Sequence, residues 1–506
     1  MSQKKNKYDN SKLFDVHKWS DYPEVNRTVD LIYRQLMQSS GMRVIHEIQK
    51  KHVKVIILDL WATWLADTKM YISYSRARNH FKGNSRYNKL HISYRTIAIV
   101  DELEKKGYVE NKIGFNDRST GNSRMSRMKA KSKLIKLIEK DCSPEMIQTH
   151  PDTECIILRD KNKNDIEYRD TTKIKSMRSD LYEYNNLIRI NHFDIPGYPK
   201  DGAYSRSEKK KIKINHSDKF VRRIFNNGSF KEGGRYYGGW WQQIPKEWRQ
   251  EIRINNAPTV EIDYSGLHIV ILYALEGIDY WKTIKKDVYE IAGYEKSDRM
   301  RNFLKQILLT ILNCKNEAEV CKSIRYSISR ANKEELKWVK KALNWKTATD
   351  QNIKKLLDDF IAPHKDIQKY FHSGFGVKLQ YIDSMMAEMV IQGMMEIGIP
   401  VLCIHDSFIV RRYYKKQLEY EMNNAFNSIL NQVRGGSRKS ILPKIKSPEA
   451  RITWFGDGAR SIKELMKNRK IFKQVMIEPA KKDTGYKIRS IRFNKLNLDK
   501  KYYGAN

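Results

Sequence analysis

Two aspartates stand where the sequence predicts that strands end or turn. The segment 259-TVEIDYSGLHIVILYALEG-277 reads as an apolar strand that reaches Asp263 and passes directly into a helical run. The segment 399-IPVLCIHDSFIVRR-412 reads as two apolar strands whose connecting turn presents Asp406. Carboxylate oxygens at such positions suit divalent cations that hold a triphosphate. The sequence therefore predicts a divalent-metal site at Asp263 and Asp406.

A third segment supplies positive charge. In 298-DRMRNFLKQILLTILN-313, Arg301 and Lys305 are four residues apart, which places both cations on one face of a helix. Such a pair can clamp a triphosphate. Taken alone, each signal has an ordinary explanation, since an aspartate after a strand is commonly a turn or cap residue and a cationic pair is commonly a solvated face. Their order and spacing together favour a site.

The three segments resemble motifs A, B and C of family A DNA polymerases and the related single-subunit RNA polymerases. The tripeptide 263-DYS-265 is similar to motif A of the DNA enzymes, and Arg301-x3-Lys305 resembles the R-x3-K of motif B. The tetrapeptide 405-HDSF-408 is similar to motif C of the RNA enzymes. Upstream, 233-GGRYYGGWWQQIP-245 stands where the family holds template and primer. The resemblance covers about residues 220–430.

This resemblance implies a role for each matching residue. Asp263 and Asp406 would hold two Mg²⁺ ions, for which Mn²⁺ can substitute, in a two-metal mechanism. Arg301 and Lys305 would bind the triphosphate, with Lys305 as a candidate proton donor to pyrophosphate. The other residues implied at the nucleotide site are Tyr264, Ser265, His268 and Thr310, and those implied to contact nucleic acid are Arg235, Gln380 and His405.

The positions that recognise the sugar depart from the family pattern. DNA polymerases of the family carry a glutamate five residues after the motif A aspartate, where it excludes the ribose 2′-hydroxyl, and this chain has His268. The Tyr-Gly pair expected late in motif B is Asn313-Cys314, and Leu309-Thr310 resembles the Met-Thr pair of the RNA enzymes. The residues at the positions that would exclude the ribose 2′-hydroxyl therefore differ from those of the DNA enzymes. The sequence leaves open whether this site prefers ribose or deoxyribose.

The N-terminal part reads as a nucleic-acid-binding domain. Apolar residues recur at helical spacing over about 28–66, and a helix capped by Ser93 and stopped by Gly107 follows. Strands over 108–113 and after residue 121 would flank a turn, so the order is that of a winged helix-turn-helix. A winged helix that serves only as a spacer or protein contact is the alternative. The candidate nucleic-acid contacts are Tyr94 and Arg95 in the recognition helix and Arg124 and Arg127 in the wing.

The expected fold class is a multidomain α+β protein. The predicted units are a flexible lead-in (1–20), the winged helix (21–150), a hairpin and helical connector with thumb elements (151–215), the palm and fingers with an antiparallel palm sheet (216–435), and a C-terminal palm end with a basic tail (436–506). The tail, including 486-YKIRSIRFNKLNLDKK-501, is predicted to contact nucleic acid or a partner, or to be solvated. The chain has no room for a proofreading exonuclease domain.

Composition points to a polyanionic partner. The chain has 506 residues with 96 Lys plus Arg against 59 Asp plus Glu, a net charge of +37 that is spread along its length. Nucleic acid is the usual partner of such a chain, although a lysine-rich proteome would also raise this charge. The five cysteines lack zinc or disulfide spacing, and no segment is apolar and long enough for a leader or a membrane span. We expect a cytoplasmic protein without membrane contact.

Several features together narrow the resemblance. The chain is similar to the family A polymerases of staphylococcal cassette chromosome elements, which are mobile. The shared features are the changed sugar-recognition positions, the HDSF motif, the missing exonuclease and the fused winged helix. That group implies a primase-like polymerase acting on single-stranded DNA with nucleoside triphosphates, a small accessory protein and a replicative helicase. The alternatives are a primer-extending DNA polymerase, a single-subunit transcriptase, and a DNA-binding replication initiator with a decayed palm.

Overall fold

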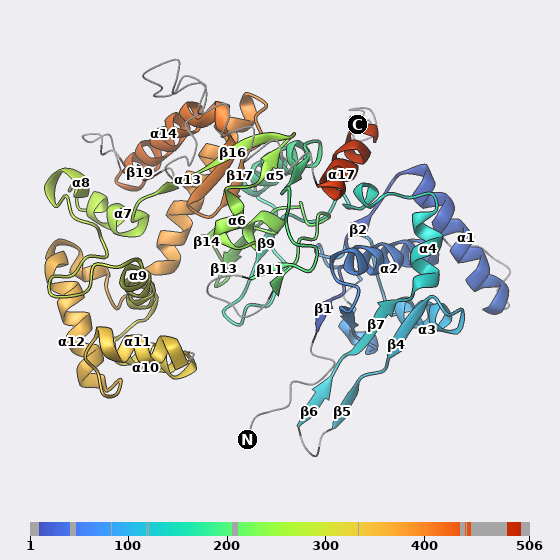
Figure 1. Ribbon diagram of the computed structural model, residues 1–506, viewed down its shortest axis with the longest axis horizontal. Helices are drawn as coiled ribbons and strands as arrows, with labels where there is room; N and C mark the ends of the chain where they lie inside the picture. Colours follow the sequence, from blue (N-terminus) through green and yellow to red (C-terminus); the bar gives the residue numbers. More distant parts are fainter. Residues whose placement is uncertain are drawn as a thin grey trace.

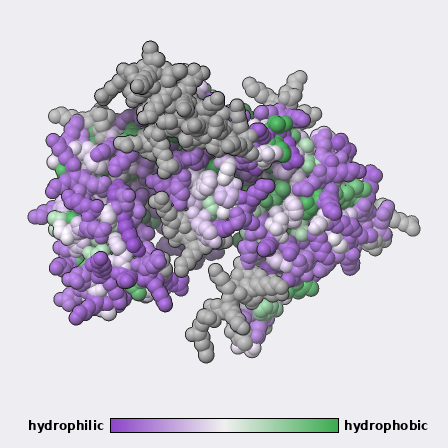
Figure 2. Space-filling view, viewed as in Figure 1, coloured by the Kyte–Doolittle hydropathy of each residue, from purple (hydrophilic) through white to green (hydrophobic). Residues whose placement is uncertain are grey.

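The computed structural model describes residues 10–40, 47–81, 83–117, 119, 121–204, 211–331, 333–435, 441, 443–446 and 483–496. Within these ranges the chain is an α+β protein, with an N-terminal region, a central sheet and a group of helices beyond it (Figure 1). One large cluster of buried apolar residues runs from Val25 to Ile147, and another runs from Cys155 to Ile441. Hydrophilic side chains cover most of the face in Figure 2, in keeping with the charge of the chain.

Helices pack around a small sheet in the N-terminal region. The helices are α1 (Pro23–Ser40), α2 (Glu47–Ala66), α3 (Arg95–Lys105) and α4 (Ser132–Glu139). The sheet has the strand order β1 (Ser11–Leu13), β3 (Tyr71–Tyr74), β7 (Ser126–Ala130), β4 (Val109–Lys112). The hairpin of β4 and β7 continues as β5 (Phe115–Asp117) and β6 (Asn122–Arg124), which project from the body (Figure 1). Strand β2 (Lys18–Trp19) pairs with β8 (Gln148–Thr149).

The start of α3 differs from the predicted cap. Tyr94 is the N-cap residue, with a helical backbone and no capping bond from its side chain. Ser93, one residue earlier, still contributes, because its hydroxyl accepts from the backbone N–H of Arg95 at 3.4 Å. His52 fixes Ser93, since its Nε2 accepts from the Ser93 backbone N–H at 2.9 Å and lies 3.1 Å from the Ser93 hydroxyl. At the other end, Gly107 has a φ of 74°, the left-handed conformation that lets a chain leave a helix.

Residues 151–215 do not form a separate connector. Strand β9 (Ile156–Leu158) pairs in parallel with β13 (Arg222–Asn226), which pairs antiparallel with β14 (Ser229–Tyr237). The hairpin expected in this segment is reduced to an isolated bridge between Arg159 and Asp165. Helix α5 (Thr172–Arg189) is its helical part and buries its apolar face in the same core as the central sheet. The boundary expected near residue 215 therefore does not divide the core. The remaining strands of this segment are β10 (Phe193–Asp194), β11 (Ala203–Tyr204) and β12 (Lys211–Ile212).

The central sheet is antiparallel. Its strand order is β10, β15 (Arg253–Ile254), β16 (Ala257–Tyr264), β18 (Ser407–Arg411), β17 (Leu402–Ile404), and β19 (Ile445–Lys446) pairs with the end of β16. Helices α7 (Leu267–Leu275), α13 (Gly376–Glu396) and α14 (Lys415–Val433) pack against one another and supply much of the main core. A short helix, α6 (Lys246–Arg249), precedes β15.

A group of helices is inserted between α7 and α13. These helices are α8 (Tyr280–Thr283), α9 (Asp298–Asn313), α10 (Glu317–Arg330), α11 (Lys333–Ala342) and α12 (Asp350–Ile361), followed by the 3₁₀ segment η4 (Ala362–Tyr370). Ser297, Asn316 and Thr349 cap α9, α10 and α12 by accepting a backbone N–H. The long helix α13 leads from this group back to the sheet (Figure 1). None of the helices in the described ranges combines the length and apolar character that crossing a membrane requires.

The described part of the basic tail packs on its own chain. Helix α17 (Thr484–Lys495) lies between the N-terminal helices and the central sheet (Figure 1). Arg489 Nε donates to Oδ2 of the buried Asp194 at 2.6 Å, and the Tyr486 hydroxyl donates to Asn256 Oδ1 at 2.5 Å. One side of this helix is therefore held by its own chain, and residues such as Lys487 and Arg492 on the other side are exposed. Residues 436–440, 442, 447–482 and 497–506 lie outside the described residues.

Candidate active site

Asp263 and Asp406 meet at one end of the central sheet. In the pairing of β16 with β18, Asp263 lies opposite Ser407, the residue that follows Asp406. Strands β17 and β18 are joined by a two-residue turn, because Ile404 pairs with Ser407. The backbone N–H of Tyr264 donates to the carbonyl oxygen of Asp406 at 3.4 Å. Segments far apart in the sequence thus place their aspartates side by side.

The turn that presents Asp406 has a strained backbone. His405 has a φ of 59° and Asp406 has a negative φ, a pattern typical of a type II′ hairpin turn, whose first residue is usually glycine. A non-glycine residue in such a conformation costs about 1–3 kcal/mol. The His405 ring packs edge-on against Tyr237, with 5.1 Å between centroids. Burial, and then the charge of Arg235, lower the pKa of His405, so its ring is neutral near pH 7.

The two carboxylates repel each other. Burial, and then the charge of Asp406, raise the pKa of Asp263 to about 7, against the opposing effect of Lys305 and Lys246. In the described part of the chain, neither Asp263 nor Asp406 has a hydrogen bond or an ion pair at its side chain. Like charges in this position favour either a retained proton or a bound cation.

The donor set fits Mg²⁺. Carboxylate oxygens are the ligands that Mg²⁺ prefers, and it usually keeps several water or phosphate ligands besides one or two carboxylates. The Ser265 hydroxyl, two residues after Asp263, is buried without a hydrogen-bond partner among the described residues. Across those residues no group of three or more His, Cys, Asp or Glu side chains is arranged to hold a metal. Ions at this pair would therefore rely on substrate phosphates and water for their other ligands.

Asp263 gives a pH-dependent contribution to stability. Its pKa of about 7 in the folded protein lies above the usual 3.8, so the folded state binds the extra proton between about pH 4 and 7. Without metal, the stability of the wild type relative to Asp263→Asn is therefore expected to fall as the pH rises through this range. Urea unfolding of both proteins in a chelator at pH 5, 6, 7 and 8 measures this difference. Mg²⁺ should restore wild-type stability at pH 8, and a difference that is flat with pH would contradict the assignment.

The cations predicted on α9 differ in their surroundings. Arg301 Nε donates to Asp287 Oδ2 at 3.2 Å, and its guanidinium lies 4.7 Å from the centre of the Tyr289 ring. Lys305 is exposed and has no ion pair within the described residues. Its charge lowers the pKa of Asp263, which places it within electrostatic reach of the carboxylate pair. Lys305 is thus available to an incoming anion, whereas Arg301 must first exchange its carboxylate partner.

Sequence reasoning missed a further cation at this edge. Lys446 lies opposite Asp263 in the pairing of β19 with β16, so both side chains share one face of the sheet. Its Nζ is 3.8 Å from Asp287 Oδ2, the oxygen that also accepts from Arg301. No local pattern marks a two-residue strand, which explains why the sequence offered no signal for Lys446.

Arg235 reaches the site because two backbones approach closely. Gly234, before it on β14, has a φ of 81°, and an added Cβ would lie 2.8 Å from Ser384 Oγ on α13 and 2.7 Å from the Phe225 ring. Glycine therefore lets β14 approach α13. Arg235 Nε donates to Asp383 at 3.1 Å (Oδ1) and 3.2 Å (Oδ2), and its Nη2 contacts the same Oδ2.

The third member of this network is His268. Its Nε2 lies 2.9 Å from Asp383 Oδ2 and 3.2 Å from Arg235 Nη2. Asp383 is 2% exposed. Burial alone would raise its pKa, but the hydrogen bond from His268 and the charge of Arg235 outweigh burial and lower it, so the carboxylate is ionised. Sequence reasoning missed Asp383, because α13 also carries other charged residues such as Lys378 and Glu388, and nothing local distinguishes this carboxylate from them. Gln380, one turn earlier on α13, is half-buried.

Two residues implied at the nucleotide site form hydrogen bonds within the fold. Tyr264 is buried, and its hydroxyl donates to the carbonyl of Met422 at 2.5 Å, because adjacent residues of a strand face opposite sides and Asp263 takes the site face. Its side chain therefore anchors the fold rather than facing a nucleotide. The Thr310 hydroxyl donates to the carbonyl of Gln306 at 2.9 Å, a bond within its own helix, but Thr310 is partly exposed and its role at the nucleotide site stays a prediction.

The nucleic-acid contacts predicted in the N-terminal region differ in their exposure. Tyr94 and Arg95 are exposed at the start of α3, and Arg124 is partly exposed on β6. Arg127 is 6% exposed, because it lies on β7 in the middle of the sheet, where its neighbours cover it. Arg127 is therefore removed from the set of candidate nucleic-acid contacts.

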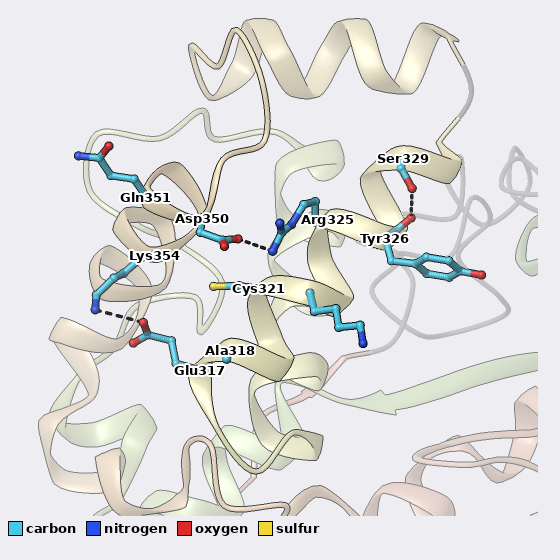
Figure 3. Close-up of a pocket in the computed structure, with 10 residues that line it drawn as sticks. Glu317, Ala318, Cys321, Arg325, Tyr326, Ser329, Asp350, Gln351 and Lys354 are labelled. Carbon is cyan, nitrogen blue, oxygen red and sulfur yellow. Dashed lines mark hydrogen bonds and ion pairs between the residues drawn. The ribbon is translucent and has the colours of Figure 1, made fainter.

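A hollow of about 870 Å³ lies between α10 and α12, and neither Asp263 nor Asp406 lines it. Four of its five charged side chains form two ion pairs, since Arg325 pairs with Asp350 at 2.5 Å and Lys354 pairs with Glu317 at 3.1 Å (Figure 3). Burial raises the pKa of the Cys321 thiol in its wall, which makes that thiol a poor nucleophile. No chemistry is assigned to this hollow.

Comparisons with known proteins assign no role to the residues of the candidate site. No family model matches the chain, and no curated protein sequence matches it. Among solved structures, the chain is similar to the POL domain of Pol1 from M. smegmatis, solved in complex with DNA primer-template and dNTP. The two are 10% identical with a TM-score of 0.28, and the match covers 85% of this chain and 66% of that one. The chain thus spans just under two thirds of that solved domain, and at this similarity no residue role passes from one to the other.

Proposed function

We propose that this chain is a DNA-templated nucleotidyltransferase with a two-metal site, and that it makes primers on single-stranded DNA. The observation that carries the proposal is the aspartate pair. Asp263 and Asp406 lie on neighbouring segments of one antiparallel sheet, have no cationic partner bonded to them within the described residues, and face nearby lysines. Such a pair is suited to metal ions that bridge to phosphates.

Each residue of the proposed site has its own role in nucleotide transfer. Asp263 and Asp406 would hold two Mg²⁺ ions, which when bound lower the pKa of an attacking hydroxyl and neutralise charge on the phosphates. The 3′-oxygen of the growing strand attacks the α-phosphorus of the incoming nucleotide, and the bond from that phosphorus to the bridging oxygen of pyrophosphate breaks. Lys305 donates a proton to the departing pyrophosphate, and Arg301 binds its charge once it leaves Asp287.

Primer synthesis, rather than extension alone, is supported by two features. The sugar position of motif A holds His268 in place of the glutamate of the DNA enzymes. The N-terminal region exposes Tyr94 and Arg95 at the start of a helix beside a projecting hairpin, an arrangement suited to holding nucleic acid. A small accessory protein and a helicase are proposed partners on the sequence resemblance alone.

Incorporation on unprimed single-stranded DNA tests the proposal. The assay supplies Mg²⁺ with all four ribonucleotides or all four deoxynucleotides, with and without an annealed primer. New short products without primer would support primase activity. Products that require the primer would make the chain an extending polymerase, and no Mg²⁺-dependent product in either case would overturn the nucleotidyltransferase assignment and favour a DNA-binding initiator.

Removing the exposed cations of the N-terminal region is expected to weaken DNA binding in a salt-dependent way. In the variant Arg95→Ala/Arg124→Ala, each lost phosphate contact should reduce the slope of log K against log salt by roughly 0.7–0.9. Fluorescence anisotropy of labelled DNA at a series of salt concentrations measures this slope. The matched control is Lys322→Ala/Lys355→Ala, which removes two exposed charges from α10 and α12. Equal slopes for the two variants would show that the N-terminal region plays no special part in binding.

A further inference from the structure

We propose that Asp383 is a positioning residue that fixes His268 and so sets the discrimination between deoxyribose and ribose. This inference rests on the proposed function, because it concerns how the nucleotide site recognises a sugar. Asp383 does not touch the reacting atoms. It acts through the ring of His268, which stands five residues after the aspartate predicted to hold metal.

The hydrogen bonds of Asp383 define the state of the His268 ring. Asp383 Oδ2 accepts from His268 Nε2 at 2.9 Å and also from Arg235 Nη2, while Oδ1 accepts from Arg235 Nε at 3.1 Å. An ionised carboxylate can only accept, so the Nε2 of His268 carries the proton. In a neutral ring Nδ1 is then an unprotonated acceptor.

Three separate elements hold the ring in place. His268 lies in the first turn of α7, directly after Gly266, whose φ is 64° and whose missing Cβ makes room for Val288 at 2.6 Å. Asp383 belongs to α13 and accepts from the ring nitrogen, and Arg235 belongs to β14 and holds the Asp383 carboxylate by donating to it. The His268 side chain is 11% exposed, so most of the ring is enclosed.

A rigid ring can discriminate where a mobile one cannot. A side chain excludes the 2′-hydroxyl of ribose only if rotating the side chain away costs more free energy than the steric clash does. A buried charge-assisted hydrogen bond to the side chain supplies that free energy. Without Asp383, His268 keeps its size but is free to rotate, and its nitrogens are free to exchange their proton. Selectivity for the sugar therefore depends on the Asp383–His268 pair and not on the size of the ring alone.

Replacing Asp383 with asparagine is the test, since the amide keeps the size of the carboxylate but has a single acceptor oxygen. Asp383→Asn is expected to reduce the ratio of kcat/KM for deoxynucleotides over ribonucleotides at least tenfold, chiefly through a lower KM for ribonucleotides. The kcat for deoxynucleotides should stay within about threefold, a difference of roughly 0.7 kcal/mol. His268→Ala should lower the ratio similarly, and the double variant should add little, because both changes remove one interaction.

The matched control is Glu388→Gln. Glu388 lies on the same helix and pairs with the buried Arg223, so its neutralisation disturbs α13 to a similar degree without touching His268. A ratio that falls equally in Glu388→Gln would mean that the helix, and not Asp383, is responsible. A ratio that changes in His268→Ala but stays within twofold of the wild type in Asp383→Asn would overturn the positioning role.

A second measurement keeps the inference testable if Asp383→Asn fails to fold. In the wild type labelled with ¹⁵N-histidine, with the signal assigned by His268→Gln, His268 is expected to be protonated at Nε2. An Nε2 that carries no proton would overturn the proposed bond whatever the activity. A wild type that incorporates no nucleotide while His268 shows the Nε2 proton would overturn the proposed function and the sugar role, and would leave the bond itself supported.

Discussion

Replacing Asp406 with alanine is expected to reduce Mg²⁺-dependent nucleotide incorporation at least a thousandfold, which corresponds to about 4 kcal/mol of transition-state stabilisation. Asp406 is one of two carboxylates that the pairing of β16 with β18 brings side by side, and its charge raises the pKa of Asp263. Without it, only Asp263 would remain to hold metal against the triphosphate. Primer extension under single-turnover conditions, at saturating Mg²⁺, measures the loss. Residual synthesis within about tenfold of the wild type would contradict the two-metal assignment.

The fold and DNA binding of the Asp406 variant should be preserved, because this carboxylate is proposed to hold metal rather than template. Removing one of two repelling charges should leave the metal-free protein at least as resistant to urea as the wild type at pH 8. Added Mg²⁺ should stabilise the wild type and not the variant. Asp366→Ala, which removes an exposed carboxylate from η4, is the matched control and should retain both incorporation and the response to Mg²⁺.

Replacing Lys305 with alanine is expected to reduce kcat/KM for nucleotides by roughly 10²–10³, the usual range for a positioned proton donor or charge. Lys305 is exposed, has no ion pair within the described residues, and is near enough to Asp263 to lower its pKa. Arg301→Ala should cost less, since Arg301 already pairs with Asp287 and must exchange that partner before it meets a triphosphate. Steady-state kinetics of single-nucleotide addition measures both.

The arginine variant separates the two roles proposed for Lys305. Lys305→Arg keeps the positive charge but cannot give up a proton at neutral pH. If Lys305 acts as the proton donor, this variant should keep KM and lose kcat. If it contributes charge alone, both constants should recover toward the wild type. Lys322→Ala on α10 removes a lysine of similar exposure and should have no effect, and an equal loss in that control would show that the effect is not local.

Much of the local structure around the candidate site could be predicted because it depends on neighbouring residues. The apolar run before Asp263 and the alternation around Asp406 are patterns of strands, and both strands form there. Arg301 and Lys305 fall on α9, whose cap, Ser297, is encoded just before it. Apolar periodicity also indicated α1, α2 and α3, because it depends on residues a few positions apart in the same helix.

The predictions that failed required knowledge of distant partners. Nothing near Ile156 shows that β9 pairs in parallel with β13, and the turn-rich residues after it suggested a hairpin instead. The basic tail is predicted to contact nucleic acid or a partner, or to be solvated, and its sequence does not show that Arg489 of α17 pairs with a buried aspartate of another segment. Arg127 reads like any other wing arginine, and only the strands on either side of β7 explain its burial.

The sequence by itself determined which residues can do chemistry and the local elements that carry them, because alternation, capping and helical spacing act over a few residues. Only the tertiary structure decided which of those residues meet. Asp383 lies 148 positions from Arg235 and 115 from His268, and Lys446 reaches Asp263 through a two-residue strand. Such contacts depend on how sheets and helices pack, and a close approach such as that of Gly234 to α13 is possible only once both elements are in place.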